Sequence, residues 1–355
     1  ATSDLHNAIH ATGVQKVFVA VGNYNVGDHS FIMKNGVEIY GGFDPGNNIR
    51  TLNDQRIMPD PSNNSQQTSI LNGQFVRPVI WNIFDAATAM DNTAVLDGFM
   101  LTNGKYTNGA GVRNVYASPT FRNLVITTNR ATITGGGMYN QNSSPVLTNV
   151  LIDHNGINEI LEPNGEQNIM GGGIYNTQNS NPVLTNVTIA DNYLRSNGVS
   201  MLGAGMFNNN SSPIIKNSIL WDNRKGFDIT SAGVDIENAG TANLTLKNTI
   251  TQGYDTGNSA DQNKVNINPN FVNFGTKNFR LSVNSPAIDA GDNTFFAGLD
   301  ANSKDIANNP RVFDFAGNKN IDMGAFEYQC IPVDYSGVTL ENQTVTYDGN
   351  PHSLS

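Results

Sequence analysis

An internal repeat constrains the fold of this 355-residue chain more than any other feature of its sequence. Four copies of a glycine-rich hexapeptide occur, at 109–114, 135–140, 171–176 and 203–208. A proline follows each copy, then an asparagine four residues later, then another asparagine six residues further on. The first asparagines are Asn123, Asn149, Asn186 and Asn217, and the second are Asn129, Asn155, Asn192 and Asn223. Self-similarity at a spacing of this size indicates a solenoid.

The spacing within each copy is nearly constant, whereas the spacing between copies is not. The last glycine and the second asparagine are 18 or 19 residues apart every time. The following gap varies and occupies residues 130–134, 156–170 and 193–202. Insertions confined to one place indicate a coil with a single tolerant corner. We therefore expect segments 156–170 and 193–202 to protrude from the same edge.

Apolar residues alternate on either side of the first asparagine, but the phase changes there. In one copy Leu147, Val150 and Ile152 stand two before, one after and three after Asn149. A single straight strand would place the first two of these side chains on opposite faces. The chain must therefore turn at Asn149, and strands joined by corners predict an all-β parallel β-helix. We expect the asparagines to stack as an inward ladder that runs from coil to coil.

The residues two positions after the first asparagine form an apolar stripe that alternation places on the outer wall. Its members are Phe99, Val125, Leu151, Thr188, Ile219 and Ile250. This alignment takes Asp97 as the first-asparagine position of an earlier, partial copy. An exposed apolar stripe of this length is unusual for a soluble monomer, so we expect a cover. The aromatic-rich segment 265–330 is the favoured cover, and an inverted inside–outside phase is the alternative.

Both ends of the predicted solenoid differ from its repeats. Residues 1–13 predict a short capping helix with Leu5 and Ile9 on one face, ended by Gly13. Strands are expected from Lys16 to Val21 and at 37–43, 68–72, 79–84 and 95–102, with an irregular excursion at 44–67. The β-helix domain is predicted to cover 1–330, closed by segment 265–330.

Composition excludes several classes of protein. The net charge is −10, only 14% of residues are charged, and 54 residues are asparagine. The acidic balance and the absence of a Lys/Arg run argue against nucleic acid as a partner. Cys330 is the single cysteine, so no intrachain disulfide forms. No apolar run is long enough for a transmembrane helix.

The repeats resemble those of polymorphic outer-membrane proteins and related right-handed β-helix surface proteins of Gram-negative bacteria. The similarity lies in the Gly-Gly-Gly-[Met/Ile]-Tyr-Asn segments and in Leu-Thr-Asn-Val runs such as 147–150. Segments 285–292, 309–311 and 321–327 resemble the closing motif of such helices in large Bacteroidetes surface proteins. The resemblance implies a right-handed, single-stranded, pectin-lyase-like solenoid. It also implies that the protein is secreted or lies on the outer cell surface. Residues 331–355 resemble a linker and the truncated start of an immunoglobulin-like domain, which implies further domains in the same polypeptide.

Function is less constrained by the sequence than fold. We expect a non-catalytic role in adhesion or in glycan or protein binding, with a surface glycan or a host or bacterial protein as partner. A polysaccharide lyase-like enzyme and a structural spacer are the alternatives. The chain has no Asp-Asp pair and no Gly-His-Gly motif, and its histidines have no evident acid–base partners, so no catalytic residue is assigned.

The candidate binding residues fall into three groups, each with a structural alternative. Loop residues Glu159, Glu162, Glu166 and Arg195 lie in the insertions, where recognition is often placed. The aromatic residues Tyr139, Tyr175 and Phe207 share a column. Their rings either bind a sugar or simply stack on one another. Lys216 and Lys247 are predicted to lie on one outward face. They either contact an anionic glycan or belong to a solvated strand face. No cofactor or metal site is assigned, although calcium would suit the cluster Asp289, Asp292, Asp300, Asp305, Asp314 and Asp322 if these residues are more than turn and capping groups.

Overall fold

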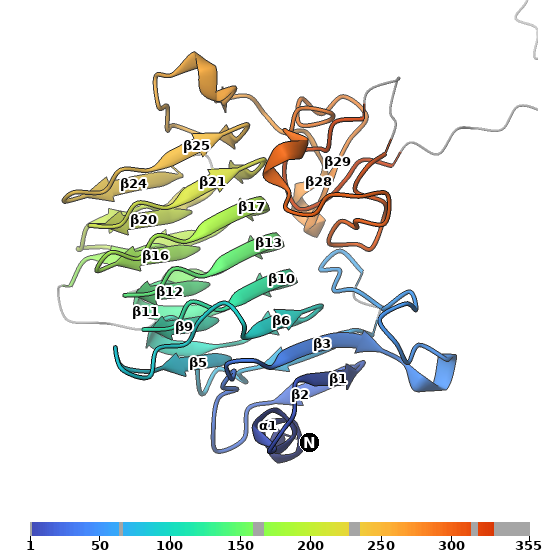
Figure 1. The fold of residues 1–355 in the computed structure, drawn as a ribbon. Helices are drawn as coiled ribbons and strands as arrows, with labels where there is room; N and C mark the ends of the chain where they lie inside the picture. Colours follow the sequence, from blue (N-terminus) through green and yellow to red (C-terminus); the bar gives the residue numbers. More distant parts are fainter. Residues whose placement is uncertain (1, 64–66, 159–166, 227–234, 314–318, 330–355) are drawn as a thin grey trace, which may run out of the picture.

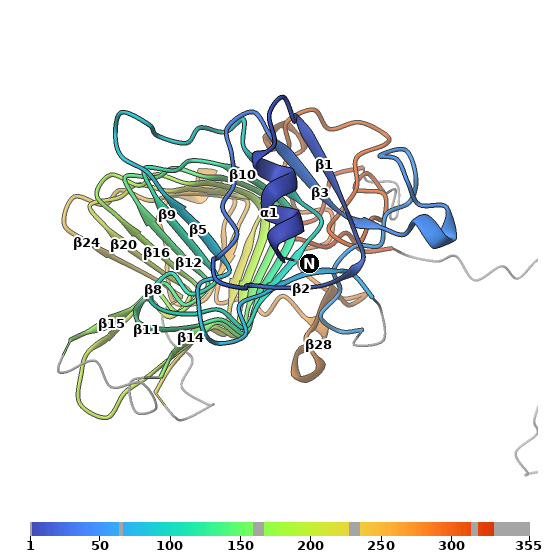
Figure 2. The ribbon, with the colours of Figure 1, turned by 90° about the horizontal axis from the view of Figure 1, so that it is seen from below.

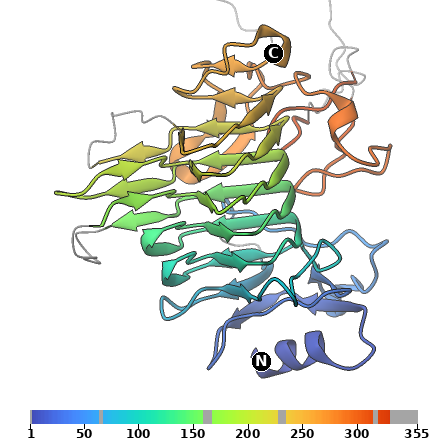
Figure 3. The same ribbon diagram turned by 60° about the vertical axis from the view of Figure 1, so that its left-hand side comes forward.

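The computed structural model describes residues 2–63, 67–158, 167–226, 235–313 and 319–329, which form a right-handed parallel β-helix, as predicted. Successive coils stack along one axis, and each coil of the central part contributes a strand to three parallel sheets (Figure 1 and Figure 3). The chain passes from sheet 1 to sheet 2 to sheet 3 and then enters sheet 1 of the next coil. The predicted linker and immunoglobulin-like start at 331–355 lie outside the described residues.

The strands of each sheet pair in parallel with those of neighbouring coils. Sheet 1 contains β1 (Lys16–Ala20), β2 (Gly22–Asn25), β3 (Glu38–Phe43), β4 (Ser69–Asn72), β6 (Val95–Asp97), β7 (Met100–Thr102), β10 (Thr120–Thr127), β13 (Val146–Asp153), β17 (Val183–Ala190), β21 (Ile214–Lys216), β22 (Ile219–Trp221), β25 (Thr245–Lys247), β26 (Ile250–Thr251) and β27 (Lys264–Val265). Sheet 2 contains β8 (Lys105–Asn108), β11 (Arg130–Thr134), β14 (Gly156–Asn158), β15 (Ile169–Met170), β18 (Tyr193–Arg195), β19 (Met201–Leu202) and β23 (Arg224–Lys225). Sheet 3 contains β5 (Ile80–Ile83), β9 (Val112–Val115), β12 (Met138–Gln141), β16 (Ile174–Thr177), β20 (Met206–Asn209) and β24 (Ile236–Ala239).

The amino-terminal helix closes one end of the solenoid. Helix α1 (Thr2–His10) lies across the first coil, as Figure 2 shows from below. Leu5 and Ile9 are buried and belong to the same apolar core as Val17 and Val19 of β1. The predicted cap is therefore confirmed: its two apolar residues cover side chains that the first coil would otherwise expose.

The lumen of the solenoid is filled by the apolar positions that the repeat predicts. In β10 the side chains of Phe121, Leu124 and Ile126 all point into this core and are fully buried. Asn123 lies between them with φ of 53°, in the left-handed region that asparagine tolerates better than most residues. The phase change read from the sequence is thus a real corner in the chain.

Two asparagine ladders run inside the wall, parallel to the solenoid axis. In the first, the Nδ2 of Asn155 donates to the Oδ1 of Asn192 at 3.1 Å, and Asn192 donates to Asn223 at 2.9 Å. The second joins the last asparagine of each glycine-rich hexapeptide, with Asn140 donating to Asn176 at 2.9 Å. Because these amides are buried, each must find its partner within the stack.

The glycines of the hexapeptide let this packing form. A Cβ on Gly137 would lie 2.7 Å from the carbonyl oxygen of Gly173 and 3.1 Å from the ladder amide of Asn155. Any side chain at this position would push the next coil away. The glycine triplets are therefore a packing requirement of the stacked coils.

The column of first asparagines is stacked as predicted, but it is not an inward ladder. Asn149 donates to Asn123 at 3.1 Å, yet it also donates to the Lys304 carbonyl at 2.7 Å. Asn186 and Asn217 donate to the carbonyls of Asp322 (2.7 Å) and Asp292 (2.9 Å). The predicted direction was wrong because the left-handed corner turns these side chains outward, where they hold the closing segment.

The outer stripe is covered by the closing segment, as expected. Val125 and Leu151 pack with Phe279, Ala325 and Phe326, whereas Ile219 and Ile250 pack with a second group that includes Leu281 and Met323. The polar member, Thr188, accepts a hydrogen bond of 3.0 Å from the backbone N–H of Ala325. The cover includes the antiparallel pair β28 (Phe271–Asn273) and β29 (Asn278–Leu281), visible beside sheet 1 in Figure 1.

One member of the stripe was assigned wrongly. The pairing of β10 with β7 places Met100, not Phe99, beside Val125. Phe99 points into the lumen core instead. Asp97 pairs with Arg122 rather than with Asn123, so the partial copy was aligned one residue out of register. The glycine at position 98, with φ of 83°, occupies the corner that asparagine fills in later coils.

Candidate functional site

A groove crosses the outer face of sheet 1 before the asparagine corner. Its floor is a column of outward side chains in strict register, in which Arg122 pairs with Thr148, Thr148 with Thr185 and Thr185 with Lys216. Three interstrand steps separate Arg122 from Lys216, a span of about 14 Å. The predicted outward direction of this column is therefore confirmed.

Two irregular segments form the walls of the groove. One wall is part of the excursion, at residues 52–58, and the other is part of the closing segment, at residues 295–308; the groove between them encloses about 630 Å³. Figure 2 shows these segments on the same side of sheet 1. They are tied together by an ion pair of 2.9 Å between Asp60 and Arg280. Burial opposes ionisation of Asp60, but Arg280 and Ser62 hold its pKa below the usual value.

The carboxylates that line the groove are already engaged within the protein. Asp97 contacts Arg56 at 2.8 Å and Arg122 at 3.4 Å. Asp54 accepts hydrogen bonds from the backbone N–H groups of residues 50 and 51. Asp305 is buried and accepts from the backbone N–H groups of residues 307, 309 and 327. Two guanidinium groups thus compensate the charge of Asp97, whereas backbone N–H groups satisfy the oxygens of Asp54 and Asp305 without neutralising them.

Of the four cations that line the groove, Arg56 and Arg122 are paired with Asp97, whereas the two lysines are not paired. The ammonium group of Lys216 lies 4.9 Å from the ring centroid of Phe295 and has no carboxylate partner among the described residues. Lys304 is exposed on the same wall as Phe295, and its ammonium group makes no ion pair or hydrogen bond within the described residues. The groove thus presents positive charge and threonine hydroxyls although the whole chain is acidic.

The second predicted lysine does not share this position. Lys247 is the register neighbour of Lys216, but it lies beyond the groove and faces Asp261 at 3.8 Å. The two lysines are therefore neighbours on adjacent strands, as predicted, but only Lys216 lines the groove.

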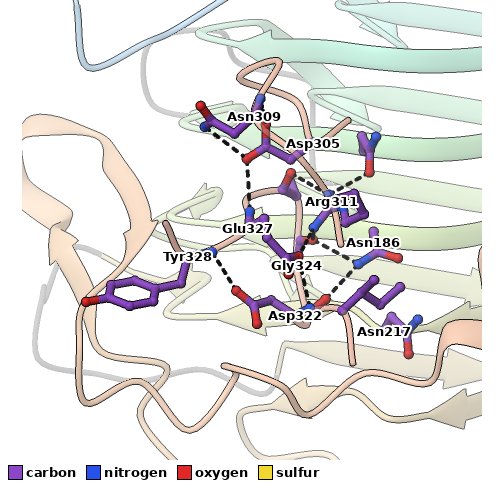
Figure 4. A network of polar contacts seen from close by, with 12 residues as sticks. Asn186, Asn217, Asp305, Asn309, Arg311, Asp322, Gly324, Glu327 and Tyr328 are labelled. Carbon is purple, nitrogen blue, oxygen red and sulfur yellow. Dashed lines mark hydrogen bonds and ion pairs between the residues drawn. The ribbon is translucent and has the colours of Figure 1, made fainter. Parts of the chain in front are cut away.

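A buried polar network holds the closing segment, and hence one groove wall, in place (Figure 4). Arg311 is fully buried; its guanidinium donates to Asn149 Oδ1 at 2.6 Å and to the Ala325 carbonyl at 2.8 Å, and lies 3.3 Å from a carboxylate oxygen of Glu327. Asp322 accepts from the backbone N–H groups of Asp289 and Tyr328. The closing motif is thus an architectural device, built from charges that satisfy backbone groups.

Burial dominates the protonation of this network. It raises the pKa of Asp322 to about 6, with the backbone N–H groups opposing the rise. It also raises the pKa of Glu327, and the positive charge of Arg311 opposes that rise. These shifts follow from the missing solvent and concern the attachment of the wall, since neither carboxylate lines the groove.

The predicted aromatic column is formed, but its rings face each other. Tyr139 and Tyr175 stack at 5.5 Å with an interplanar angle of 8°, and Tyr175 and Phe207 stack at 5.8 Å. The three side chains are between 5% and 9% exposed. Packing uses these rings, so they offer little surface to a sugar.

The two predicted insertions occupy equivalent places in successive coils, but their ends belong to sheet 2 rather than to protruding loops. The first separates β14 from β15, the second separates β18 from β19, and these strands pair with one another in sheet 2. Arg195 lies 4.7 Å above the ring centroid of Tyr193. Glu159, Glu162 and Glu166 lie outside the described residues.

A charge cluster that the sequence analysis missed occupies the second corner of the coils. His154 contacts Asp153 through Nδ1 at 2.8 Å and Asp191 through Nε2 at 2.7 Å. Burial opposes the charge, but the two carboxylates raise the pKa of His154 to about 9. Asp191 also faces Arg224 at 3.4 Å. His154 and Asp191 each directly precede a ladder asparagine, and that shared offset was the signal that would have found the pair.

No metal centre is apparent in the part of the chain that the structure describes, where no group of three or more His, Cys, Asp or Glu residues could hold an ion. Four of the aspartates proposed for calcium have local roles. Asp292 and Asp300 accept backbone hydrogen bonds in turns, whereas Asp305 and Asp322 belong to the buried network. Asp289 adopts a left-handed turn conformation, and Asp314 lies outside the described residues.

Comparison with known proteins does not specify a family. No protein-family model matches the chain, and no curated protein is significantly similar to it. A crystal structure of pectate lyase Pel9A resembles it over 91% of this chain and 90% of that one, with 13% identity and a TM-score of 0.35. The likeness is a distant one between parallel β-helices.

Proposed function

We propose that this protein is a non-catalytic, secreted or cell-surface β-helix protein that binds an acidic glycan strand in the groove on sheet 1. One observation carries the proposal: among the described residues Lys216 and Lys304 have no carboxylate partner, whereas each carboxylate that lines the groove is bound by groups of the protein. Carboxylate or sulfate groups on a linear glycan would supply the missing partners. The long, shallow floor suits an extended chain better than a compact ligand.

The neutral lining supports the same ligand. Thr148 and Thr185 offer hydroxyls along the floor, and Phe295 and Phe296 line one wall. Hydroxyls bond sugar hydroxyls in either direction, and ring faces pack against the C–H groups of sugars. A net charge of −10 makes a polyanion a poor ligand for the protein as a whole, but the four cations that line the groove outnumber its three carboxylates.

The surface context rests on the repeats and the closing motif, which resemble those of surface proteins of Gram-negative bacteria, including Bacteroidetes. The partner would then be a surface glycan, and adhesion its consequence. Among the described residues, no helix is long and apolar enough to cross a membrane. A lyase-like enzyme acting on the same glycan is the second candidate, because acidic polysaccharides are lyase substrates too.

Binding and turnover can be separated in one experiment. Polygalacturonate, alginate and a neutral glucan are titrated against the protein by calorimetry, and the mixtures are then assayed for unsaturated products by ultraviolet absorbance. We expect one of the acidic polymers to bind without product formation. Binding should weaken as salt is added, because exposed charges are screened beyond about 8–10 Å at physiological ionic strength.

Matched variants locate the binding site. Lys216→Ala and Lys304→Ala should each weaken binding severalfold, whereas Lys264→Ala, on strand β27 outside the groove, should leave it unchanged. Equal losses in all three variants would indicate nonspecific attraction and contradict the proposal. Product formation would instead support the lyase, and failure of all acidic polymers to bind would favour a spacer.

A further inference from the structure

The aromatic column on sheet 3 does not begin at Arg113, where the repeat begins. Strand β5 pairs with β9 so that Trp81 lies beside Arg113, one coil earlier than the first hexapeptide. The guanidinium of Arg113 lies 5.4 Å from the Trp81 ring centroid and 4.8 Å from that of Tyr139. Arg113 therefore separates the packed rings of later coils from Trp81, whose outer side is not covered by another ring of the column.

Trp81 and Tyr106 form an aromatic corner that is open to solvent. Their rings meet edge to face at 4.9 Å, and Tyr106 is 39% exposed. They line a pocket of about 390 Å³ with the exposed residues Asp28, His29 and Arg77. This volume lies within the range of small-molecule sites. The pocket is separate from the groove on sheet 1, since the two have no lining residue in common.

Several polar groups that line this pocket make no hydrogen bond or ion pair in the part of the chain that the structure describes. Within the described residues, the carboxylate of Asp28, the hydroxyl of Ser30 and the guanidinium of Arg77 make no hydrogen bond or ion pair. The same holds for the indole N–H of Trp81 and the hydroxyl of Tyr106. Donors and acceptors are thus available around an aromatic surface, and the charges of Asp28 and Arg77 offset each other.

A strained turn forms the rim of the pocket. Gln74 and Phe75 both adopt left-handed backbone conformations, with φ of 53° and 56°. This is unfavourable for a bulky residue such as Phe75, and it leaves Val76 65% exposed at the pocket. Strain of this kind persists where the surrounding structure enforces it, often next to a ligand site.

We propose that this pocket binds a single neutral pyranose residue, at the end of a glycan or as a free glycoside. The apolar C–H face of the sugar would pack against Trp81 and Tyr106. Vicinal hydroxyls would donate to Asp28 and accept from Arg77. The balanced charge of the pocket favours an uncharged sugar, in contrast to the cationic groove.

Tryptophan fluorescence provides a direct test, because Trp81 and Trp221 are the two tryptophans of the chain. In a Trp221→Phe background the emission reports on Trp81 alone. Methyl glucoside, methyl galactoside and methyl mannoside are titrated separately. We expect a saturable change with one of them, with a dissociation constant on the order of 1 mM, as suits a few contacts. No saturable change with any glycoside, in protein shown to be folded by circular dichroism, would overturn the proposal.

Variants of exposed polar residues keep the test independent of folding. Asp28→Asn and Arg77→Gln should each weaken binding about tenfold, which corresponds to 1.4 kcal/mol. The groove variant Lys304→Ala should leave it unchanged, so this pocket and the groove are tested separately. Equal binding by Asp28→Asn, Arg77→Gln and the parent protein would show that the sugar binds elsewhere and would contradict the assignment.

Discussion

Two of the three asparagine columns of this solenoid lie six residues apart in every repeat, and they have different functions. Asn155, Asn192 and Asn223 point into the wall and bond one another from coil to coil. Asn186 and Asn217 point outward and bond backbone carbonyls of the closing segment, more than 70 residues away in sequence. One column stabilises the stack itself, and the other attaches a separate structural unit to it.

Backbone conformation explains the difference. Asn149, Asn186 and Asn217 occupy corner positions with φ between 46° and 53°. At the next corner the left-handed residue is not the ladder asparagine but the residue before it, such as His154 or Asp191. At both corners the left-handed residue directs its side chain outward. A residue type that recurs at a constant spacing therefore does not determine where its side chain points. The position of the residue relative to the corner determines this.

The largest expected effect concerns the outward column and its partner Arg311. Arg311→Ala should destabilise the closing segment by about 3–5 kcal/mol, because Glu327 and Asn149 lose a buried partner. Limited proteolysis should then cleave within 265–329 while the solenoid coils stay protected. The double variant Arg311→Met with Glu327→Leu should recover part of the loss, since it removes the unpaired Glu327 carboxylate, although buried Asp322 still loses the positive charge of Arg311. Unchanged protection in Arg311→Ala would show that the apolar stripe alone holds the cover.

The next largest losses of stability are expected when one asparagine of each column is replaced. Asn192→Ala and Asn186→Ala should each reduce stability by about 1–3 kcal/mol for every buried polar group that they leave without a partner. Asn192→Ala should lower the free energy of global unfolding, as measured by urea denaturation. Asn186→Ala should mainly increase proteolysis of the closing segment. Asn186→Gly serves as control, because glycine relieves the strain of a positive φ and isolates the loss of the amide.

Identical unfolding and proteolysis profiles for Asn192→Ala and Asn186→Ala would contradict the division of roles. The two columns would then form one cooperative unit, and the outward column would be part of the stack.

The smallest effect concerns the last rung of the inner ladder, where Asp235 takes the place of an asparagine. It accepts from the Nδ2 of Asn223 at 2.8 Å, and burial raises its pKa to about 7. Between about pH 4 and 7 the folded protein therefore holds this proton more tightly than the unfolded chain does. Stability should fall as the pH rises through this window, and Asp235→Asn should make the fall smaller; the raised pKa values of Asp322 and Glu327 account for the remainder. Urea denaturation at several pH values checks this, and an unaltered slope in the variant would exclude Asp235 as its source.

The sequence predicted much of the fold because the repeat encodes short-range rules. Apolar spacing around Asn123 and Asn149 located the corners, and the fixed spacing located the insertions. The prediction of the register failed at Asp97, because that coil lacks the corner asparagine and strand pairing sets the register there.

The sequence also predicted part of the candidate site. The outward column was recognised, but Lys304 and Phe295 come from a segment whose path the repeat does not encode.

The sequence by itself determined the coil: which side chains fill the lumen, where the chain turns, and that an apolar outer stripe required a cover. Those features depend on neighbours a few residues apart or one repeat apart. Only the tertiary structure decided where the closing segment lies, that Arg311 meets Asn149, and that the Asp60–Arg280 ion pair joins the two walls of the groove. These contacts join residues more than 150 positions apart, so they depend on long-range packing that no local spacing encodes.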